Sequence, residues 1–264
     1  MRKKKVAVLM VGVNRSLPFA LPSINREIIN PIRSAKNLEL QTFAYFIAPR
    51  GHHINNPRSS ESGFIGKSLP EALSQWNHVH TSAETLLEEA PRRTSFFNLP
   101  WHYDLKTVSN LYQYLSALET CFERFIQDGG FHAVILCRPD LVVFPGLRIV
   151  EKLKLMNFLS LISRRVAIVP HWQNWGGVND RFAILSHDAA KGYLTRIRLA
   201  AELDSDGDLL NSELLAKEGL SGAIIQNSIR TPMVRVRLGN RFEKTDLDYF
   251  YTEFDTSSYP IDGG

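Results

Sequence analysis

The sequence predicts an α/β fold in which helices cover both faces of a mixed, mostly parallel β-sheet. Short, almost continuously apolar runs alternate along the chain with stretches whose apolar residues recur at helical spacing. Runs of this kind are typical of strands that are buried on both faces. No internal repeat interrupts the alternation. We therefore expect a single domain over residues 1–264, with its core at about 5–238 and an aromatic, acidic tail, 239–264, packed on it.

Seven apolar runs are the predicted strands, and glycine, proline or polar residues flank them. In chain order they cover residues 6–13, 38–47, 132–137, 166–170, 181–186, 222–229 and 233–238. The first run follows the basic sequence "MRKKK", a combination that also begins signal peptides. Its apolar part is only about eight residues long and no small-residue cleavage site follows, so we interpret it as a buried strand.

Four stretches carry the apolar periodicity of helices. They cover residues 16–32, 104–127, 187–202 and 212–218. The first has prolines near its start, where they are tolerated. The longest begins at Asp104, a favourable N-cap residue, and Gly129 and Gly130 end it. The polar loop 48–68 and the basic, aromatic loop 91–103 are long enough to have functions of their own, the second as an acceptor site or a lid.

Composition and charge exclude several classes of protein. The chain is 44% hydrophobic and 22% charged, which is ordinary for a globular protein, and no stretch approaches the ~20 apolar residues of a transmembrane helix. The formal net charge of +4 suits an anionic small ligand such as a nucleotide but is too small for a nucleic-acid-binding protein. Two cysteines, Cys121 and Cys137, give no disulfide framework, which fits a cytoplasmic location. The basic N-terminus could still contact an acidic membrane surface.

Several familiar motifs are absent. The sequence contains no G-x-G-x-x-G after the first strand, no phosphate-binding G-x-x-x-x-G-K, no H-E-x-x-H and no G-x-S-x-G. "DSDGD" at 204–208 has its glycine at the fourth instead of the sixth position of a calcium loop, so an acidic turn is the better interpretation. His78 and His80 would share one face of a strand, but no third metal ligand accompanies them.

Charged residues follow two of the predicted strands, and ligands of open α/β sheets bind outside the carboxyl ends of strands. Arg138 and Asp140 end the run in "ILCRPDLVVF". Asp140 suits a hard cation that bridges a diphosphate, and the alternative is an Arg138–Asp140 pair that stabilises a turn. After the first strand, Gly12 would let the backbone approach a ligand, and Arg15 can bind two phosphate oxygens. Alternatively, Arg15 is an exposed residue at the start of a helix.

Four stretches in a fixed order resemble a known family. They are "VAVLMVGVNRSL", "RPDLVVF", "WGGVNDRFAI" and "NSELLAKEGL", and the resemblance covers roughly residues 5–238. The sequence resembles the GT-A-type nucleotide-sugar glycosyltransferases encoded in bacterial polysaccharide loci and in some large DNA viruses. The resemblance implies a Rossmann-like sheet, a UDP- or GDP-linked sugar donor, a saccharide acceptor and Mn²⁺ or Mg²⁺ as cofactor. It also implies a cytoplasmic site of action, in the host cytoplasm if the protein is viral.

The same resemblance implies roles for the residues at the strand ends. Gly12 and Arg15 would lie against the nucleotide, and Asp140 would stand where the last acid of the usual D-x-D motif holds the metal. Arg138 departs from the pattern, because many members have the first acid there. The departure bears on the ribose contact and on metal dependence, and an arginine at this position could offset the diphosphate charge directly.

The loop before the fifth predicted strand would contact the sugar. Gly176 and Gly177 would allow a sugar ring to approach the backbone, while Trp175, or alternatively Trp172, stacks on its apolar face. Asn179 would form hydrogen bonds with sugar hydroxyls.

Two carboxylates are candidate bases, because an inverting transferase must deprotonate the acceptor hydroxyl. Asp180 is the preferred base, and the alternative is that it only pairs with Arg181. Glu213 is the second candidate. The alternative is that its only role is a favourable interaction with the helix dipole, because it lies in the first turn of its helix.

Two other functions are compatible with these residues. The first is a metal-dependent phosphohydrolase or nucleotidyltransferase that uses Asp140 and needs a second metal-binding acid nearby. The second is a non-catalytic module that binds a nucleotide or a carbohydrate.

Overall fold

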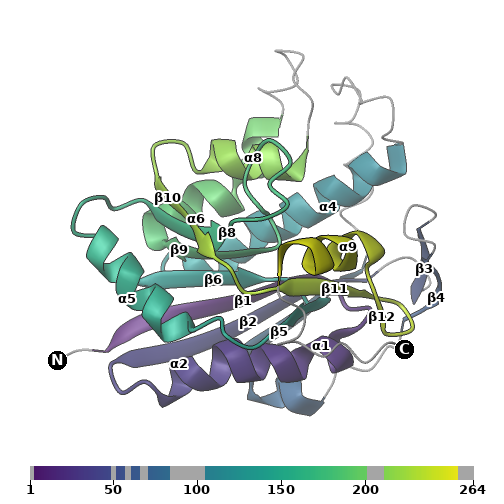
Figure 1. Cartoon of the computed structure of the whole chain (residues 1–264), viewed down its shortest axis with the longest axis horizontal. Helices are drawn as coiled ribbons and strands as arrows, with labels where there is room; N and C mark the ends of the chain where they lie inside the picture. The colour runs from purple at the N-terminus through teal and green to yellow at the C-terminus, as the bar shows by residue number, and fades with distance from the viewer. Residues whose placement is uncertain are drawn as a thin grey trace.

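A mixed β-sheet of seven strands forms the centre of the computed structural model (Figure 1), which describes residues 3–48, 52–56, 61–65, 71–83, 105–200 and 211–254. Its strand order is β10-β8-β9-β6-β1-β2-β5. The strands are β1 (Lys4–Val13), β2 (Leu38–Ala48), β5 (His78–Ala83), β6 (Ala133–Cys137), β8 (Val166–Pro170), β9 (Phe182–Ser186) and β10 (Ile224–Ile229). The expected α/β fold with a mostly parallel sheet is confirmed.

One strand runs against the others. β9 is antiparallel to both β6 and β8, whereas the remaining neighbours in the sheet are parallel. Phe182, the first residue of β9, lies opposite Cys137, the last residue of β6. The loop 171–181 before β9 therefore lies at the same edge of the sheet as the residues that follow β1 and β6. We call this side the carboxyl edge and the opposite side the amino edge.

Helices cover both faces of the sheet, as Figure 1 shows. One face carries α1 (Leu17–Ile24), a π-helical turn η1 (Asn25–Ile29), α2 (Asn30–Ser34) and α5 (Ile149–Leu159). The other carries α4 (Leu105–Cys121), its π-helical extension η6 (Phe122–Ile126), α6 (His187–Leu194), the 3₁₀ turn η7 (Arg196–Leu199) and α8 (Ser212–Gly219). Successive residues of β1 enter opposite cores: Val8 packs on the first face and Leu9 on the second. This burial on both sides explains why the strands are continuously apolar.

Two smaller sheets and further helical elements accompany the main sheet. A three-stranded sheet has the order β12 (Arg241–Phe242), β11 (Met233–Arg237) and β7 (Leu141–Val143), and the hairpin β3 (His53–Asn56) and β4 (Glu61–Phe64) is antiparallel. Helix α9 (Lys244–Glu253) packs beside β11 through a small apolar cluster that contains Val234 and Phe250. The 3₁₀ turn η4 (Glu71–Gln75) precedes β5.

The structure differs from the sequence-based expectations in several elements. The run 233–238 forms β11 in the small sheet, and the predicted loop 48–68 contains the β3–β4 hairpin. The prolines of the first helical stretch are not all near its start, since Pro22 lies inside α1 and is followed by the π-helical turn. Loop 91–103, the turn 204–208 and the end of the tail lie outside the described residues. Among those described, no helix is both long enough and apolar enough to cross a membrane.

Candidate functional site

The carboxyl edge brings together the candidate residues from four segments of the chain. Arg15 follows β1, Arg138 and Asp140 follow β6, Asp180 precedes β9, and Glu213 begins α8. Ion pairs with Asp140 connect the first two segments, and hydrogen bonds connect the last two. The edge therefore contains two parts, an arginine-rich part around Asp140 and a carboxylate pair, Asp180 and Glu213.

Asp140 lies at the centre of the arginine-rich part. Arg138 donates two hydrogen bonds to it, from Nε to Oδ1 at 2.9 Å and from an Nη to Oδ2 at 3.1 Å. Arg15 Nε lies 3.6 Å from Oδ2, and the Asp140 side chain is only 1% exposed. Burial alone would raise the pKa of Asp140, but the charges of Arg138 and Arg15 together hold it well below its usual range. The structure thus contains the Arg138–Asp140 ion pair, which was the alternative to a metal ligand at Asp140.

Sequence reasoning missed a second buried carboxylate next to this pair. Glu61 of β4 is 1% exposed and accepts a hydrogen bond from Arg15 at 2.6 Å and another from the backbone N–H of Leu238 at 2.9 Å. Arg237 of β11 lies 3.5 Å from the same carboxylate and also pairs with Glu243. No sequence signal pointed to Glu61, because it lies in a stretch of polar residues that predicted only a loop.

The donor set around Asp140 does not fit Mn²⁺ or Mg²⁺. A hard cation needs carboxylate oxygens that are free to face it, and guanidinium groups occupy both oxygens of Asp140. Glu61 is likewise held by Arg15 and Leu238. Within the described ranges, no group of three His, Cys, Asp or Glu residues could hold a metal ion. Three arginines, Arg15, Arg138 and Arg237, surround two carboxylates here, which favours an anion over a cation.

Backbone conformation and close packing explain why position 12 is a glycine. Its φ of +141° is in the region that favours glycine, and a Cβ added there would lie 3.1 Å from the Pro139 ring. The end of β1 thereby packs closely against the turn that carries Arg138 and Asp140. The predicted contact between Gly12 and a nucleotide stays a prediction, and the neighbour that the structure gives Gly12 is Pro139.

The carboxylate pair occupies the other part of the edge. Asp180 is 7% exposed, and its Oδ2 accepts a hydrogen bond from the Ser212 hydroxyl at the start of α8. The Tyr114 hydroxyl of α4 donates to the Asp180 backbone carbonyl at 3.3 Å. Burial and the charge of Asp180 raise the pKa of Tyr114 to about 12, so this hydroxyl stays protonated near neutral pH.

The pKa of Glu213 is raised towards neutral pH. Burial raises its pKa, and the charge of Asp180 raises it further, to about 7, against smaller opposing effects of Arg181 and Arg235. Its backbone is also fixed, because Val178 N–H donates to the Glu213 carbonyl at 2.9 Å. A Cβ added to Gly177 would overlap the backbone of Glu213, so this glycine lets the loop before β9 and helix α8 pack in direct contact.

The predicted sugar contacts in the loop fall into two groups. Trp175 is 65% exposed, and a side chain at Gly176 would meet nothing within 4 Å, so both face open space. Asn179 is buried, donates to the Trp172 carbonyl at 2.9 Å and accepts from Arg181 N–H at 3.1 Å. Both ends of its amide thus hold the loop together, which does not support the predicted hydrogen bonds to sugar hydroxyls. Trp172 is buried as well, which leaves Trp175 as the tryptophan that can stack on a sugar.

The expected alternative pairing of Asp180 with Arg181 is wrong. Arg181 donates to Asp246 of α9 at 2.8 Å and also to Gln173, and Arg235 contributes a second guanidinium to the same carboxylate. Burial alone would raise the pKa of Asp246, but the hydrogen bonds from Arg235 and the charge of Arg181 lower it on balance. Asp180 is therefore available for a role other than an ion pair with its neighbour.

Arg196 is a buried cation beside the pair that sequence reasoning did not single out. Its side chain is fully buried, lies 4.3 Å above the Tyr193 ring and 5.9 Å above the Tyr114 ring, and donates to the Tyr193 carbonyl at 2.7 Å. Its Nε and one Nη have no hydrogen-bond partner in the part of the chain that the structure describes. No sequence signal separates Arg196 from the other arginines, because only the fold brings η7 beside Tyr114.

Three residues that the sequence singled out lie away from these contacts. His78 of β5 stacks against both Phe43 and Phe125, at 6.0 and 5.6 Å between ring centroids, and this packing explains its place in the strand. Cys121 and Cys137 are buried free thiols, and burial raises the pKa of Cys137 to about 12.

Comparisons with known proteins give similarity in structure only. No family model matches the sequence, and no curated protein matches it. The chain is similar to mouse xyloside xylosyltransferase 1 in its apo form, with a TM-score of 0.41 and 11% identity over 86% of this chain and 84% of that one. It is also similar to the galactosyltransferase LgtC in complex with donor and acceptor sugar analogues. That match and one to an active-site mutant of LgtC each have a TM-score of 0.40 and 12% identity, over 83% of this chain and 72% of the other.

Proposed function

We propose that this chain is a glycosyltransferase, which moves a sugar from a UDP- or GDP-linked donor to a saccharide acceptor at the carboxyl edge. The observation that carries the proposal is the placement of two carboxylates, Asp180 and Glu213, where the loop before β9 meets the start of α8. Burial and the charge of Asp180 raise the pKa of Glu213 to about 7, which suits proton transfer at neutral pH. Glu213 lies beside Asp180 and next to the loop that carries the exposed Trp175, an aromatic surface on which a sugar ring can stack. The resemblance of the sequence to nucleotide-sugar glycosyltransferases supports the same reaction.

In the proposed step, Glu213 takes the proton of an acceptor hydroxyl as its oxygen attacks the anomeric carbon of the donor sugar. A new carbon–oxygen bond forms, the bond from that carbon to the phosphate oxygen breaks, and the nucleoside diphosphate leaves with the electron pair. Glu213 is favoured over Asp180 as the base because Oδ2 of Asp180 already accepts a hydrogen bond from Ser212. Asp180 is then a positioning residue, whose charge raises the pKa of Glu213.

The arginine-rich part of the edge binds the diphosphate in this proposal. Arg15 Nε has no hydrogen-bond acceptor among the described residues, and the Arg138 side chain is 18% exposed. Guanidinium groups form strong, often bidentate hydrogen bonds with phosphate oxygens and carry the charge that offsets a leaving diphosphate. The rival phosphohydrolase or nucleotidyltransferase is less well supported, because it needs a metal ion at Asp140, where the residues do not fit one.

The proposal is tested by incubating the protein with UDP- and GDP-sugars and saccharide acceptors and measuring the release of nucleoside diphosphate. A general base contributes roughly 10²–10⁴-fold, so Glu213→Gln should lower turnover by about that factor with little change in donor affinity. Glu218→Gln, on the same helix, is the matched control and should keep full turnover. Asp180→Asn should keep part of the activity and move the rise of turnover with pH to lower pH, because Glu213 loses a neighbouring negative charge.

Two outcomes contradict the proposal. Full turnover of a folded Glu213→Gln protein removes this residue as the base and returns that role to Asp180. Binding of nucleoside diphosphates without release from any sugar donor, even by slow hydrolysis, favours the non-catalytic binding module.

A further inference from the structure

Three large apolar side chains lie exposed at the end of α5. Phe158 is 62% exposed, Leu161 is 84% exposed and Ile162 is 72% exposed. They are close in sequence, and backbone hydrogen bonds from Leu161 to Phe158 and from Ile162 to Leu159 continue the helix as a tight turn. A contiguous group of this kind has no role in the core and indicates a surface that contacts something apolar.

Basic side chains lie next to this turn. Lys4 Nζ donates to Asn157 Oδ1 at 2.8 Å, and Lys4 N–H donates to the Asn37 carbonyl at 2.9 Å. The first contact joins the N-terminal lysines to the residue before Phe158, and the second brings them beside Lys36. Arg164 is exposed two residues after Ile162. Within the described part of the chain, Lys3, Lys4, Lys36 and Arg164 take part in no ion pair.

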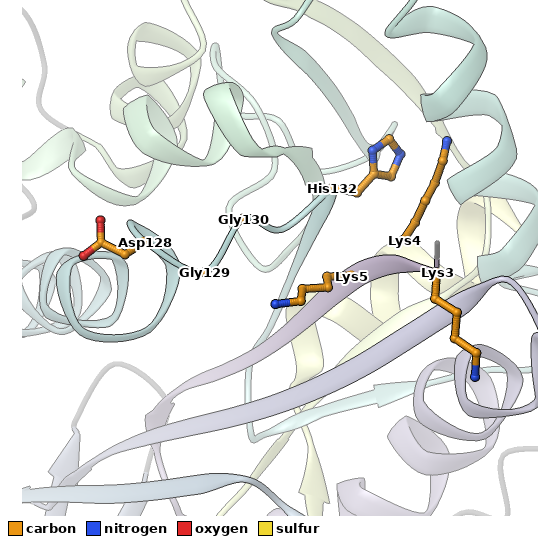
Figure 2. A pocket seen from close by; sticks show the side chains of 7 residues that line it. All are labelled: Lys3, Lys4, Lys5, Asp128, Gly129, Gly130 and His132. Carbon is orange, nitrogen blue, oxygen red and sulfur yellow. The ribbon is translucent and has the colours of Figure 1, made fainter. Parts of the chain in front are cut away.

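A cavity of about 570 Å³ opens beside the same lysines (Figure 2). Its lining residues are Lys3, Lys4, Lys5, Asp128, Gly129, Gly130 and His132. The lining thus contains three lysines and one acidic residue. In Figure 2 the ammonium groups of Lys3, Lys4 and Lys5 point in different directions. The positive charge is therefore spread over the surface and does not converge on a point where one small ligand would bind.

This region lies on the other side of the sheet from the candidate functional site. The lysines begin β1, His132 precedes β6, and the turn 160–165 precedes β8. Since these three strands are parallel in direction, their amino ends share the amino edge, and Figure 1 shows the N-terminus and α5 on the same side of the molecule. The group does not therefore belong to the site at the carboxyl edge.

We propose that this region docks the protein on an anionic lipid surface. We call it the amino-edge patch, and it consists of Lys3, Lys4, Lys36, Phe158, Leu161, Ile162 and Arg164. Peripheral proteins bind such surfaces by placing apolar side chains at the boundary of the acyl chains and cations at the level of the anionic headgroups. The patch has both features side by side, and none of its positive charges is neutralised by an ion pair within the described residues. In this orientation the carboxyl edge of the sheet faces away from the lipid. The inference does not depend on the proposed function.

The test is sedimentation of the full chain with vesicles of phosphatidylcholine alone and of phosphatidylcholine mixed with phosphatidylglycerol. Binding is expected to the anionic vesicles, and salt should weaken it because each cation near such a surface contributes about fivefold to the affinity at ordinary ionic strength. Leu161→Ser/Ile162→Ser and Lys3→Glu/Lys36→Glu should each weaken binding by about tenfold or more. All four positions are exposed, and thermal unfolding checks that the variants stay folded.

Matched controls change the same kinds of residue elsewhere. Phe64→Ser replaces an aromatic side chain that is 75% exposed on β4, and Lys191→Glu/Lys217→Glu reverses two exposed lysines on α6 and α8. Both should bind the anionic vesicles like the unchanged protein. Absence of binding to anionic vesicles at low salt overturns the proposal, as does equal weakening in the controls. A lipid-free dimer that Leu161→Ser/Ile162→Ser dissociates also overturns it, because the patch then serves a second copy of this chain.

Discussion

A carboxylate that is partly removed from water beside a second carboxylate destabilises a folded protein once it becomes charged. Glu213 is in this position, because burial and the charge of Asp180 both disfavour its ionised form. The fold tolerates the arrangement because Asn211 caps the start of α8 through a 2.6 Å hydrogen bond to Leu214 N–H and because Gly177 allows the close contact beside it. Residues that carry such a cost without serving the core are candidates for a function.

The unfavourable ionisation of Glu213 predicts how the free energy of unfolding changes with pH. The folded pKa of Glu213, about 7, lies above its unfolded value, so the folded state binds more protons between the two and stability falls as pH rises through this window. Glu213→Gln removes the ionisation. It should stabilise the protein by about 1–3 kcal/mol at pH 8 and change it little at pH 4, since one pKa unit corresponds to about 1.4 kcal/mol.

Urea unfolding of both proteins at several pH values measures the effect. Glu218→Gln on the same helix is the control and should not change the slope. A Glu213→Gln protein with the same dependence on pH as the unchanged chain would mean that Glu213 is not desolvated as the structure has it.

Single residues also mark the limit of what the sequence could predict at the site. The spacing of Arg138 and Asp140 allowed both a metal ligand and an ion pair, and only the directions of the side chains distinguish the two. The partner of Arg181 is Asp246, which is 65 positions later, and the partner of Arg15 is Glu61 in a hairpin that sequence reasoning treated as a loop. Ion pairs between distant segments leave no periodic pattern in a sequence.

At the scale of elements, the apolar strands could be predicted because burial on both faces leaves a continuous signal. The short strand β7, helix α5 and helix α9 were missed. β7 has three residues, and α9 mixes acidic and aromatic residues, so that no clear apolar face is visible. The antiparallel direction of β9 was not evident either, since direction depends on how the chain crosses the sheet. That direction is what places the loop 171–181 at the same edge as Arg138 and Asp140.

Helix α9 fixes this loop through the Arg181–Asp246 pair, and the pair can be measured. Asp246 is buried and also accepts hydrogen bonds from Arg235, so Asp246→Asn leaves two guanidinium groups without their carboxylate. It should destabilise the protein by about 3–5 kcal/mol, and Arg181→Ala by less, because Asp246 keeps Arg235.

A double-mutant cycle by urea unfolding should give a coupling energy of more than about 1 kcal/mol between positions 181 and 246. The control cycle pairs Arg181→Ala with Asp180→Asn and should give a smaller coupling. A larger coupling between 180 and 181 than between 181 and 246 would contradict the arrangement of the loop.

At the scale of the whole molecule, the positive charge is divided between the two edges of the sheet. The carboxyl edge carries arginines that are compensated in part by buried carboxylates, whereas the amino edge carries exposed lysines without ion-pair partners in the described ranges. The net charge of +4 in the sequence could predict an anionic ligand but not this division. It follows from the topology, which brings strand ends that are distant in sequence to the same side.

The arginines of the carboxyl edge predict binding of a nucleoside diphosphate without a metal ion. Burial lowers the pKa of Arg237, and the charges of Arg235 and Arg15 lower it further, because the cations are crowded and a bound anion would relieve their repulsion. UDP or GDP at about 100 times its Kd should stabilise the fold by about 2.7 kcal/mol, and EDTA should leave this unchanged.

Thermal unfolding with each nucleotide, in EDTA or in manganese, is the measurement. Arg15→Lys keeps the charge but loses the planar fork, so the nucleotide should raise the melting temperature less. The rise is measured against the same variant without nucleotide, because Arg15 also pairs with the buried Glu61. Arg33→Lys, on the exposed side of α2, is the control and should respond like the unchanged chain. A nucleotide effect that appears only with manganese would contradict the prediction and return Asp140, or acids outside the described residues, to the role of metal ligand. No effect of any nucleoside diphosphate at millimolar concentration would contradict the donor site itself, because crowded arginines that bind no phosphate serve only the fold.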